Sequence, residues 1–399
     1  MTSEPPDQPQ RAPLLLAIDG DSLLHRAYHA MADSEHRDDD GRPVWGLRGL
    51  VTFIAAAAAR LGPDALLVGL DSHVDAVRKA DFPGYKAHRA DKHPDLAAQL
   101  DQAPALLADG GFCVVRPPGY EADDVLASGA ALARRQGWRS VLVTSDRDSF
   151  ALIDDSTWVL RVRNGGIDDS PVLTPELLPQ VCGVPPERYR DYAALRGDSS
   201  DNLPGARGIG GKTAAKLLSV FSCVDDAFAA LDSGRRSEVA AAVGEAAADR
   251  LADPHSRALV VRNQRLMAMR DDLDLPDLDR MRLPLAPARL RGALATRGIR
   301  LTGSVWALVG EPAPVWLVPG YDRAPHYLPR DLPSDLSRDL LRDLAADPLP
   351  GATRREAPPI RLPEPEPAEV AAVHARLRAM VRPIRKARVA IAQDQLSLF

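Results

Sequence analysis

The hexapeptide Gly119-Tyr120-Glu121-Ala122-Asp123-Asp124 places three carboxylates within four residues of the chain. Apolar residues follow it at spacings of three and four between Val125 and Ala133, which predicts that a helix begins here. Acidic side chains in the first turn of a helix complement the positive end of its dipole, but one or two of them suffice for that role. Three carboxylates indicate a further function if other acidic residues gather at the same place.

Three aliphatic runs, which we predict to be strands, each end in aspartate: Leu14–Ile18 in Asp19, Ala65–Leu70 in Asp71, and Val141–Ser145 in Asp146 with Asp148 two residues later. Such runs, separated by helical stretches, are typical of parallel strands covered on both faces. Phe112–Val115 supplies a further strand, and we expect Thr157–Val162 to form an edge strand. Sites in such sheets form where the carboxyl ends of the strands meet. The sequence therefore predicts an α/β fold with a parallel sheet and one acidic edge.

So many carboxylates at one edge cannot all stay ionised without counter-cations. Oxygen-only ligands suit magnesium or manganese. The pattern therefore predicts a paired-metal site for phosphoryl transfer rather than a solvated acidic edge. His25 and His29 have the i, i+4 spacing of zinc ligands, but no third ligand lies nearby in the sequence, so we interpret them as one face of a helix.

The composition is that of a globular protein from a reducing compartment. With 399 residues, 45% of them hydrophobic, the chain can form two domains and additional segments. Its three cysteines have no paired spacing, which argues against disulfides and zinc. Residues 1–10 are polar, and the apolar stretch Phe53–Ala59 stops at Arg60, so we expect neither a signal peptide nor a membrane span. We expect a cytoplasmic monomer.

The net charge of −5 does not favour a nucleic-acid partner, but an acidic metal site inflates the negative count while basic patches act locally. Only six of the 50 basic residues are lysines, and five of these occur in two short stretches: Lys79, Lys86 and Lys92, then Lys212 and Lys216. The first stretch includes the basic, aromatic segment Val77–Arg89, which follows Asp71 closely. We predict that this segment is a mobile cover over the metal site rather than a solvated loop.

A glycine-rich turn follows the loop Gly197–Asn202 and opens a helix, within the stretch Leu203–Leu218. Such a turn presents free backbone N–H groups that bind anions. A Walker loop is disfavoured, because a helix rather than a strand precedes the turn and the spacing before Lys212 fits only loosely. Two helices joined by Gly208-Ile209-Gly210 instead predict a helix-hairpin-helix that holds a nucleic-acid backbone without reading bases.

Taken together, these motifs resemble the flap endonuclease or 5′-nuclease family, in particular the bacterial 5′–3′ exonuclease that occurs fused to DNA polymerase I. The resemblance extends from about Leu14 to about Ile299. It rests on six motifs, which are specific in combination: Ile18-Asp19-Gly20, Pro83-Gly84-Tyr85-Lys86, Gly119 to Ala127, Thr144-Ser145-Asp146-Arg147-Asp148, Gly197 to Asn202, and the Gly205 to Lys216 hairpin.

The resemblance implies a 5′–3′ exonuclease and structure-specific 5′ flap endonuclease that hydrolyses DNA phosphodiester bonds by a two-metal mechanism in replication and repair. It implies two Mg²⁺ or Mn²⁺ ions. By matching position, the first ion would be held by Asp19, Asp71, Glu121 and Asp123, and the second by Asp146, Asp148 and Asp201, with Asp124 and Asp198 assisting directly or through water.

The resemblance also implies catalytic and DNA-binding residues outside the acidic edge. Arg26, Lys86 and Arg89 would be catalytic, the last two on a helical arch at about residues 73–95. The residues expected to bind DNA, with a potassium ion in the hairpin, are Arg78, Tyr85, Gly205, Gly208, Gly210, Lys212, Thr213 and Lys216. Relatives often carry tyrosine where this chain has His25, a difference that argues against a base-stacking role there and leaves the metal chemistry unaffected.

We predict three segments: a PIN-like nuclease domain over 12–183, an all-helical domain with the helix-hairpin-helix over 184–310, and a disordered tail over 311–399. The tail contains a proline-rich linker, since Pro312–Pro367 holds 13 of the chain's 35 prolines. Its final pentapeptide resembles the motif by which bacterial proteins dock on the DNA sliding clamp, with Gln395, Leu396, Leu398 and Phe399 as the contacts. No polymerase sequence is present, so we expect a stand-alone, nucleoid-associated nuclease.

Two alternatives belong to other functional classes. A haloacid-dehalogenase-type phosphatase could use Asp19-Gly20-Asp21 and the later Asp198 and Asp201, but it needs Thr-Leu where the chain has Ser22-Leu23. It also leaves the acidic helix and the hairpin unexplained. A catalytically silent DNA-binding scaffold is the other alternative, and the nine clustered carboxylates argue against it because their mutual repulsion is costly.

Overall fold

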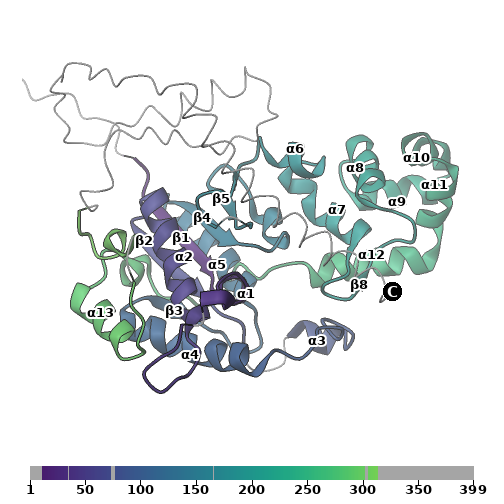
Figure 1. Cartoon of the computed structure of the whole chain (residues 1–399). Helices are drawn as coiled ribbons and strands as arrows, with labels where there is room; N and C mark the ends of the chain where they lie inside the picture. Colours follow the sequence, from purple (N-terminus) through teal and green to yellow (C-terminus); the bar gives the residue numbers. More distant parts are fainter. Residues whose placement is uncertain (1–10, 35, 73–76, 165, 302–303, 313–399) are drawn as a thin grey trace, which may run out of the picture. The chain divides into compact units, whose positions relative to one another are not determined.

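A computed structural model describes residues 11–34, 36–72, 77–164, 166–301 and 304–312, and the sheet at its centre is shown in Figure 1. The strand order is β3-β2-β1-β4-β5-β6, with every neighbouring pair parallel except β5 and β6. The strands are β1 (Leu14–Asp19), β2 (Ala65–Gly69), β3 (Cys113–Val115), β4 (Arg139–Thr144), β5 (Thr157–Arg161) and β6 (Val172–Leu173). The predicted parallel sheet is confirmed. The expected edge position of β5 is wrong, because the short antiparallel strand β6 pairs with its outer side.

Helices cover both faces of the sheet, which explains why its strands are continuously aliphatic. Side chains alternate along β1: Leu16 and Ile18 join one core, whereas Leu15 and Ala17 face the opposite way. The first core is completed by α1 (Gly20–Ala30), α2 (Trp45–Leu61) and α4 (Pro94–Gly110). The other face is covered by α5 (Ala122–Arg135), the helix that the acidic hexapeptide opens.

The segment from about residue 178 to 267 is helical and shares a core with α5. Its buried residues, such as Tyr189 and Leu217, belong to the same cluster as Leu126 and Leu142. A two-stranded hairpin of β7 (Gly197–Asp198) and β8 (Leu203–Pro204) interrupts it. The helices are α6 (Leu178–Cys182), α7 (Tyr189–Arg196), α8 (Gly211–Val220), α9 (Val224–Asp232), α10 (Arg236–Val243), α11 (Glu245–Ala252) and α12 (Pro254–Leu266).

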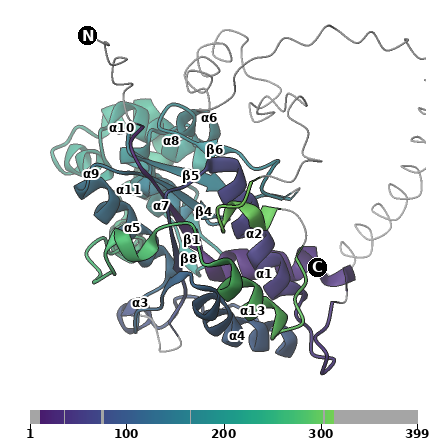
Figure 2. The same cartoon turned by 90° about the vertical axis from the view of Figure 1, so that its left-hand side faces the viewer.

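The chain returns to the first core after α12, which differs from the helical domain predicted over 184–310. Leu285, Leu290 and Leu308 are buried with the helices of the first core. Helix α13 (Pro287–Ala295), which the sequence predicted as a helix from Ala288 to about Thr296, packs against α4 (Figure 2). The physical reason is that the apolar faces of this last segment are completed by α2 and α4 and not by the helices that precede it in sequence.

Short helices complete the described residues: α3 (Val77–Asp81) and the 3₁₀ turns η1 (Ala32–Ser34), η2 (Asp148–Leu152), η3 (Pro186–Arg188), η4 (Leu278–Met281) and η5 (Ser304–Ala307). Within these residues, no helix is long and apolar enough to cross a bilayer. The predicted tail, including its clamp-binding residues Gln395, Leu396, Leu398 and Phe399, lies outside the described residues from residue 313 onward.

Candidate active site

The carboxyl ends of β1 and β4 are joined through Asp19, which is buried. One carboxylate oxygen of Asp19 caps α1 by accepting from the Ser22 N–H at 2.9 Å. The other oxygen accepts from the Thr144 hydroxyl at 2.7 Å, and Thr144 Oγ1 in turn accepts from the Asp146 N–H at 3.0 Å. Asp19 and Asp146 are therefore held side by side at the ends of adjacent parallel strands, as the sequence predicted.

Asp71 connects β2 to the start of α5. Its Oδ1 accepts from the Ala122 N–H at 2.9 Å, and its own N–H donates to Asp21 Oδ2 at 2.7 Å. Asp21 is a further buried carboxylate of this edge that the site prediction did not include. Its place in the first turn of α1, two residues after Asp19, was the signal available in the sequence.

Burial and mutual repulsion disfavour the charged forms of these acids. Burial, with repulsion from Asp71, raises the pKa of Asp19 to about 8. Burial, with repulsion from Asp146 and then Asp198, raises the pKa of Asp148 to about 8. Burial also raises the pKa of Asp123 well above its usual range, with further contributions from Asp146 and Asp19. Asp123 thus interacts with Asp19 at the end of β1 and with Asp146 after β4. The carboxylates therefore form one cluster in which each charge affects the others.

The chemistry of this cluster fits divalent cations. Asp123 Oδ1 and Asp148 Oδ1 are buried, and neither accepts a hydrogen bond. Buried carboxylate oxygens without donors, surrounded by like charges, are suited to hard cations such as Mg²⁺ or Mn²⁺. Across the described residues, however, no three acidic, histidine or cysteine side chains stand as a ready ligand set. Two of the predicted ligands, Glu121 and Asp201, are instead in contact with basic side chains.

Those basic side chains come from the predicted cover segment. The Lys86 ammonium contacts Glu121 and lies 3.9 Å from Asp201. Arg89 Nη2 donates to Asp201 Oδ1 at 2.7 Å. The Tyr85 hydroxyl reaches both acids, at 2.9 Å from Glu121 and 3.1 Å from Asp201. Burial would raise the pKa of Glu121, but Lys86 and Arg78 outweigh it and hold that pKa below its usual range.

The backbone around Lys86 is strained where it meets the Asp201 loop. Lys86 and Asn202 both have positive φ angles, 56° and 57°, which are uncommon for residues other than glycine. The Lys86 N–H donates to the Asp201 carbonyl at 3.0 Å, and Asn202 Nδ2 donates to the Gly84 carbonyl at 2.7 Å. Such strain costs about 1–3 kcal/mol per residue and persists where surrounding contacts impose it, often at functional sites.

Arg78 and Asp124 form a buried pair rather than lining the site. The Arg78 guanidinium donates to the two Asp124 oxygens at 2.8 and 2.7 Å. Asp124 is fully buried and also accepts from the N–H groups of Glu121 and Arg270 at 3.1 and 2.9 Å. The predicted roles of Asp124 as a metal ligand and Arg78 as a DNA contact do not fit this arrangement, because both charged groups are used within the protein. The pair instead positions Glu121.

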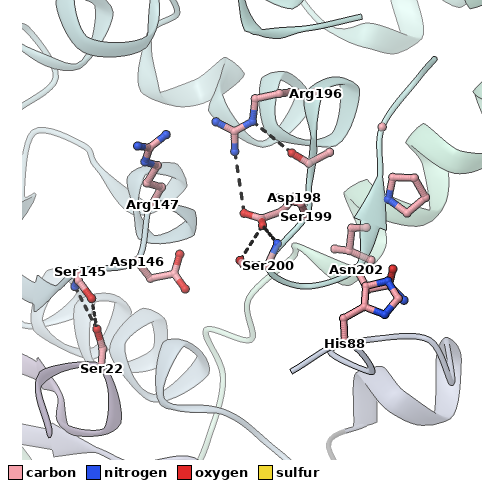
Figure 3. A pocket seen from close by; sticks show the side chains of 14 residues that line it. Ser22, His88, Ser145, Asp146, Arg147, Arg196, Asp198, Ser199, Ser200 and Asn202 are labelled. Carbon is pink, nitrogen blue, oxygen red and sulfur yellow. Dashed lines mark hydrogen bonds and ion pairs between the residues drawn. The ribbon is translucent and has the colours of Figure 1, made fainter. Parts of the chain in front are cut away.

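A pocket of about 880 Å³ connects the acidic edge with the predicted hairpin. It is lined by Asp146 from the loop after β4, by Asp198 from β7 and by Gly205, the first glycine of the hairpin. Arg196 and Asp198 lie 4.0 Å apart on one side of this pocket, while Ser22 and Ser145 hydrogen-bond to each other on the other side (Figure 3). Substrate bound at Asp146 and Asp198 would therefore extend toward the hairpin.

The turn before α8 requires glycine where two stretches of backbone approach each other most closely. A Cβ on Gly205 would lie 2.4 Å from the Leu195 carbonyl oxygen, and one on Gly197 would lie 2.3 Å from the Gly205 nitrogen. Gly208 and Gly210 follow in the turn, and α8 begins at Gly211. Lys212 and Lys216 are exposed on α8 and Thr213 is half-buried, so these three of the residues predicted to bind DNA lie together on one helix.

Arg26, predicted to be catalytic, does not contact the acidic cluster in this structure. Its Nη1 donates to Asn164 Oδ1 at 3.1 Å, in a separate pocket.

Burial lowers the pKa of the preceding residue, His25, to about 4, and the charges of Lys92 and His29 add to that effect. His25 is therefore neutral near pH 7.

Two family models match the chain. Residues 14–176 match the N-terminal, resolvase-like domain of 5′–3′ exonucleases, and residues 184–287 match their C-terminal SAM fold. The chain belongs to the 5′–3′ exonuclease family. The resemblance to this family is thus confirmed, and the two matched regions coincide with the sheet and with the helices that follow it.

Curated relatives match this chain at moderate identity. The chain is 32% identical to DNA polymerase I of Mycobacterium tuberculosis over 274 residues, which are 69% of this chain and 29% of the relative. It is 36% identical to the thermostable DNA polymerase I of Thermus aquaticus over 218 residues, 55% of this chain and 25% of the relative. The chain therefore spans less than a third of the length of these relatives.

Among solved structures, the T5 D15 protein co-crystallised with metal ions has the same fold. Its TM-score is 0.50 at 20% identity, over 71% of this chain and 94% of that chain. This likeness confirms the arrangement of a mixed sheet followed by helices.

Proposed function

We propose that the protein is a divalent-metal-dependent 5′–3′ exonuclease and 5′ flap endonuclease that hydrolyses DNA in replication and repair. The observation that carries this proposal is the coupled cluster of buried carboxylates, in which Asp123 and Asp148 keep oxygens without hydrogen-bond donors. The substrate would be a DNA end, nick or flap. Three free cysteines among the described residues agree with action in the cytoplasm.

The residues divide into two groups that would hold Mg²⁺ or Mn²⁺. Asp19, Asp71 and Asp123, with Glu121 once Lys86 leaves it, would hold one ion. Asp146, Asp148, Asp198 and Asp201, whose charges repel one another, would hold the other. When bound, two such ions activate water and stabilise the leaving oxygen. Asp21 would orient Asp71 through the hydrogen bond to its backbone.

The basic side chains above the acids would neutralise them before substrate arrives. Lys86 and Arg89 contact Glu121 and Asp201 in this structure, at the positions proposed for metal ligation. Their release would leave two cations on the cover segment, close enough to contact the scissile phosphate. We propose that the hairpin, with Lys212, Lys216 and a potassium ion, holds the duplex backbone beyond them.

Cleavage of labelled 5′-flap DNA with Mg²⁺ and with a chelator tests the proposal. A metal-dependent nuclease releases short 5′ products with Mg²⁺ and none with the chelator. A small-molecule phosphatase would leave the flap intact but hydrolyse a phosphate monoester. Binding of the flap without product under either condition would favour a DNA-binding scaffold and contradict the proposal.

Lys86→Ala is expected to slow single-turnover cleavage by about a hundredfold, the scale of losing one charged group that stabilises a transition state. DNA affinity should change little, because a lost transition-state contact lowers kcat and a lost uniform contact raises KM. The measurement is the cleavage rate at saturating enzyme. Lys79→Ala removes the same charge from an exposed position of the same segment and serves as control. A normal single-turnover rate with weaker binding would make Lys86 a DNA tether.

We further propose that the tail tethers the nuclease to the DNA sliding clamp, on the strength of the sequence alone. Gln395 would take a polar subsite, while Leu396, Leu398 and Phe399 would fill an apolar groove. The proline-rich linker would then raise the effective concentration of the nuclease at junctions that the clamp encircles.

Deleting residues 395–399 is expected to eliminate clamp binding in calorimetry and to leave cleavage of naked flap DNA unchanged. Replacing Ser397 alone by alanine provides a control within the same motif. Unaltered clamp affinity after the deletion would contradict the tether.

A further inference from the structure

A second pocket, of about 400 Å³, lies next to the active-site pocket and contains three arginines. Its lining residues are Arg26, Ser145, Arg161, Val162, Arg163 and Asn164. Ser145 lines both pockets and directly precedes Asp146. The second pocket is therefore adjacent to the acidic cluster but contains none of its carboxylates.

Sheet topology brings these arginines together. Arg161 is the last residue of β5, Arg163 follows two residues later, and Arg26 belongs to α1, the helix after β1. Strands β1, β4 and β5 are neighbours and parallel, so the segments that follow them meet at one edge. Arg147, in the loop after β4, points away from Asp146 in Figure 3. The four guanidinium groups thus come from the segments that follow three neighbouring strands, and Arg26 is far from the other three in the sequence.

No acid neutralises these arginines among the residues that the structure describes. Within the described part of the chain, the side chains of Arg147, Arg161 and Arg163 form no ion pair with a carboxylate, whereas Arg78, Arg89 and Arg134 each have one. Arg26 Nε is buried without a partner, and its Nη1 contacts only the neutral amide of Asn164. Burial, together with the charges of Arg147 and Arg163, lowers the pKa of Arg161, which reflects the repulsion within this group.

We propose that Arg26, Arg161 and Arg163 form a subsite for a phosphate of the DNA strand that is being cut. Guanidinium groups bind phosphate oxygens through paired, charge-assisted hydrogen bonds. An anion here would accept a hydrogen bond from the unpartnered Nε–H of Arg26 and would relieve the repulsion among the arginines. Because Ser145 joins this pocket to the one containing Asp146, a strand bound at the acidic cluster can place a neighbouring phosphate at the arginines. This inference rests on the proposed DNA substrate.

The subsite is tested by DNA binding without cleavage, using the full chain and a chelator. The variants are Arg163→Gln and the double variant Arg161→Gln with Arg163→Gln. Arg163 is exposed, and its side chain has no hydrogen-bond or ion-pair partner among the described residues, so the single variant should fold normally. The matched control is Arg135→Gln, which removes an exposed arginine from the last turn of α5. This turn lies at the end of α5 that is far from the acidic cluster.

Fluorescence anisotropy with a single-stranded oligonucleotide would give Kd at several salt concentrations. The double variant should bind roughly tenfold more weakly than the control variant. Its slope of log K against log salt should fall by about 0.7 for each lost phosphate contact on a single strand. The single variant should show a smaller change in the same direction.

Oligonucleotides with a 5′-phosphate and with a 5′-hydroxyl distinguish the two sources of phosphate. If the double variant loses affinity only for the phosphorylated strand, the subsite takes the terminal phosphate; equal losses assign it an internal one. A double variant with the affinity and salt slope of Arg135→Gln would overturn the proposal. Failure of the wild-type protein to cut flap DNA would contradict the proposed function separately, because these measurements involve no cleavage.

Discussion

Replacing Asp146 by asparagine is expected to slow flap cleavage by about a thousandfold or more, while DNA affinity stays nearly unchanged. Metal-assisted charge stabilisation is worth several kcal/mol, and each 1.36 kcal/mol corresponds to about tenfold in rate. A neutral amide is a poor ligand for a divalent cation, so most of that stabilisation would be lost. Binding should persist because the substitution removes no positive charge that contacts phosphate.

Asparagine suits this test because it preserves the local structure. Asp146 Oδ1 accepts from the Asp148 N–H at 3.0 Å, and the amide oxygen of asparagine can accept the same hydrogen bond. Burial raises the pKa of Asp146, and the charge of Asp201 raises it further. The variant relieves that repulsion, so its melting temperature should be equal to or above that of the wild type. Loss of activity could then not be attributed to unfolding.

Single-turnover cleavage, anisotropy and thermal melting together provide the measurement. Asp169→Asn, which removes an exposed carboxylate from the loop between β5 and β6, is the matched control and should retain full activity. Cleavage by Asp146→Asn at a rate near that of the wild type would show that Asp146 is not a metal ligand.

The parallel sheet and its acidic edge could be predicted because their signals are local in sequence. Each of β1, β2 and β4 contains an aliphatic run, and an aspartate ends the strand or follows it within two residues. Parallel strands bring such ends together. Asp198 and Asp201 have no such signal. Their place beside Asp146 depends on how the helical segment packs, and the prediction came from resemblance to the nuclease family.

The differences between prediction and structure involve contacts between distant segments. Nothing near Asp21 shows that its carboxylate accepts a hydrogen bond from Asp71, 50 residues away. The return of Leu285 and Leu308 to the first core depends on apolar faces of α2 and α4 that earlier segments leave incomplete. Arg161 and Arg163 resemble ordinary residues at the end of a strand until the fold places them beside Arg26.

The charges of Arg78 and Asp124 alone also could not predict the structural roles of these residues. In sequence, Arg78 is one basic residue in a basic segment, and Asp124 is one of three acids at the start of a helix. The structure separates them from their neighbours by burial, since Asp124 is fully buried and the Arg78 side chain is 13% exposed. Of the three acids, Asp123 faces the cluster while Asp124 turns inward to the guanidinium.

Arg78→Met is expected to lower the free energy of unfolding by about 3–5 kcal/mol, the usual cost of removing one partner of a buried ion pair. Methionine retains much of the apolar volume of arginine but leaves the Asp124 carboxylate without its bidentate donor. The Arg78 guanidinium also donates to the Leu266 and Ala268 carbonyls at 2.8 and 3.2 Å. The variant therefore loses the connection between α3, α5 and the end of α12.

Denaturant unfolding of the wild type and of Arg78→Met provides the measurement. Arg270→Met is the matched control. The Arg270 side chain pairs with Asp272 at 2.6 Å on the surface, where such pairs contribute about 0–1 kcal/mol. Its backbone N–H, which donates to Asp124, is unaffected by the substitution. A destabilisation by Arg78→Met no larger than that of the control would contradict the structural role of Arg78. If stability were unchanged and DNA affinity fell, Arg78 would be the DNA contact that the family resemblance implied.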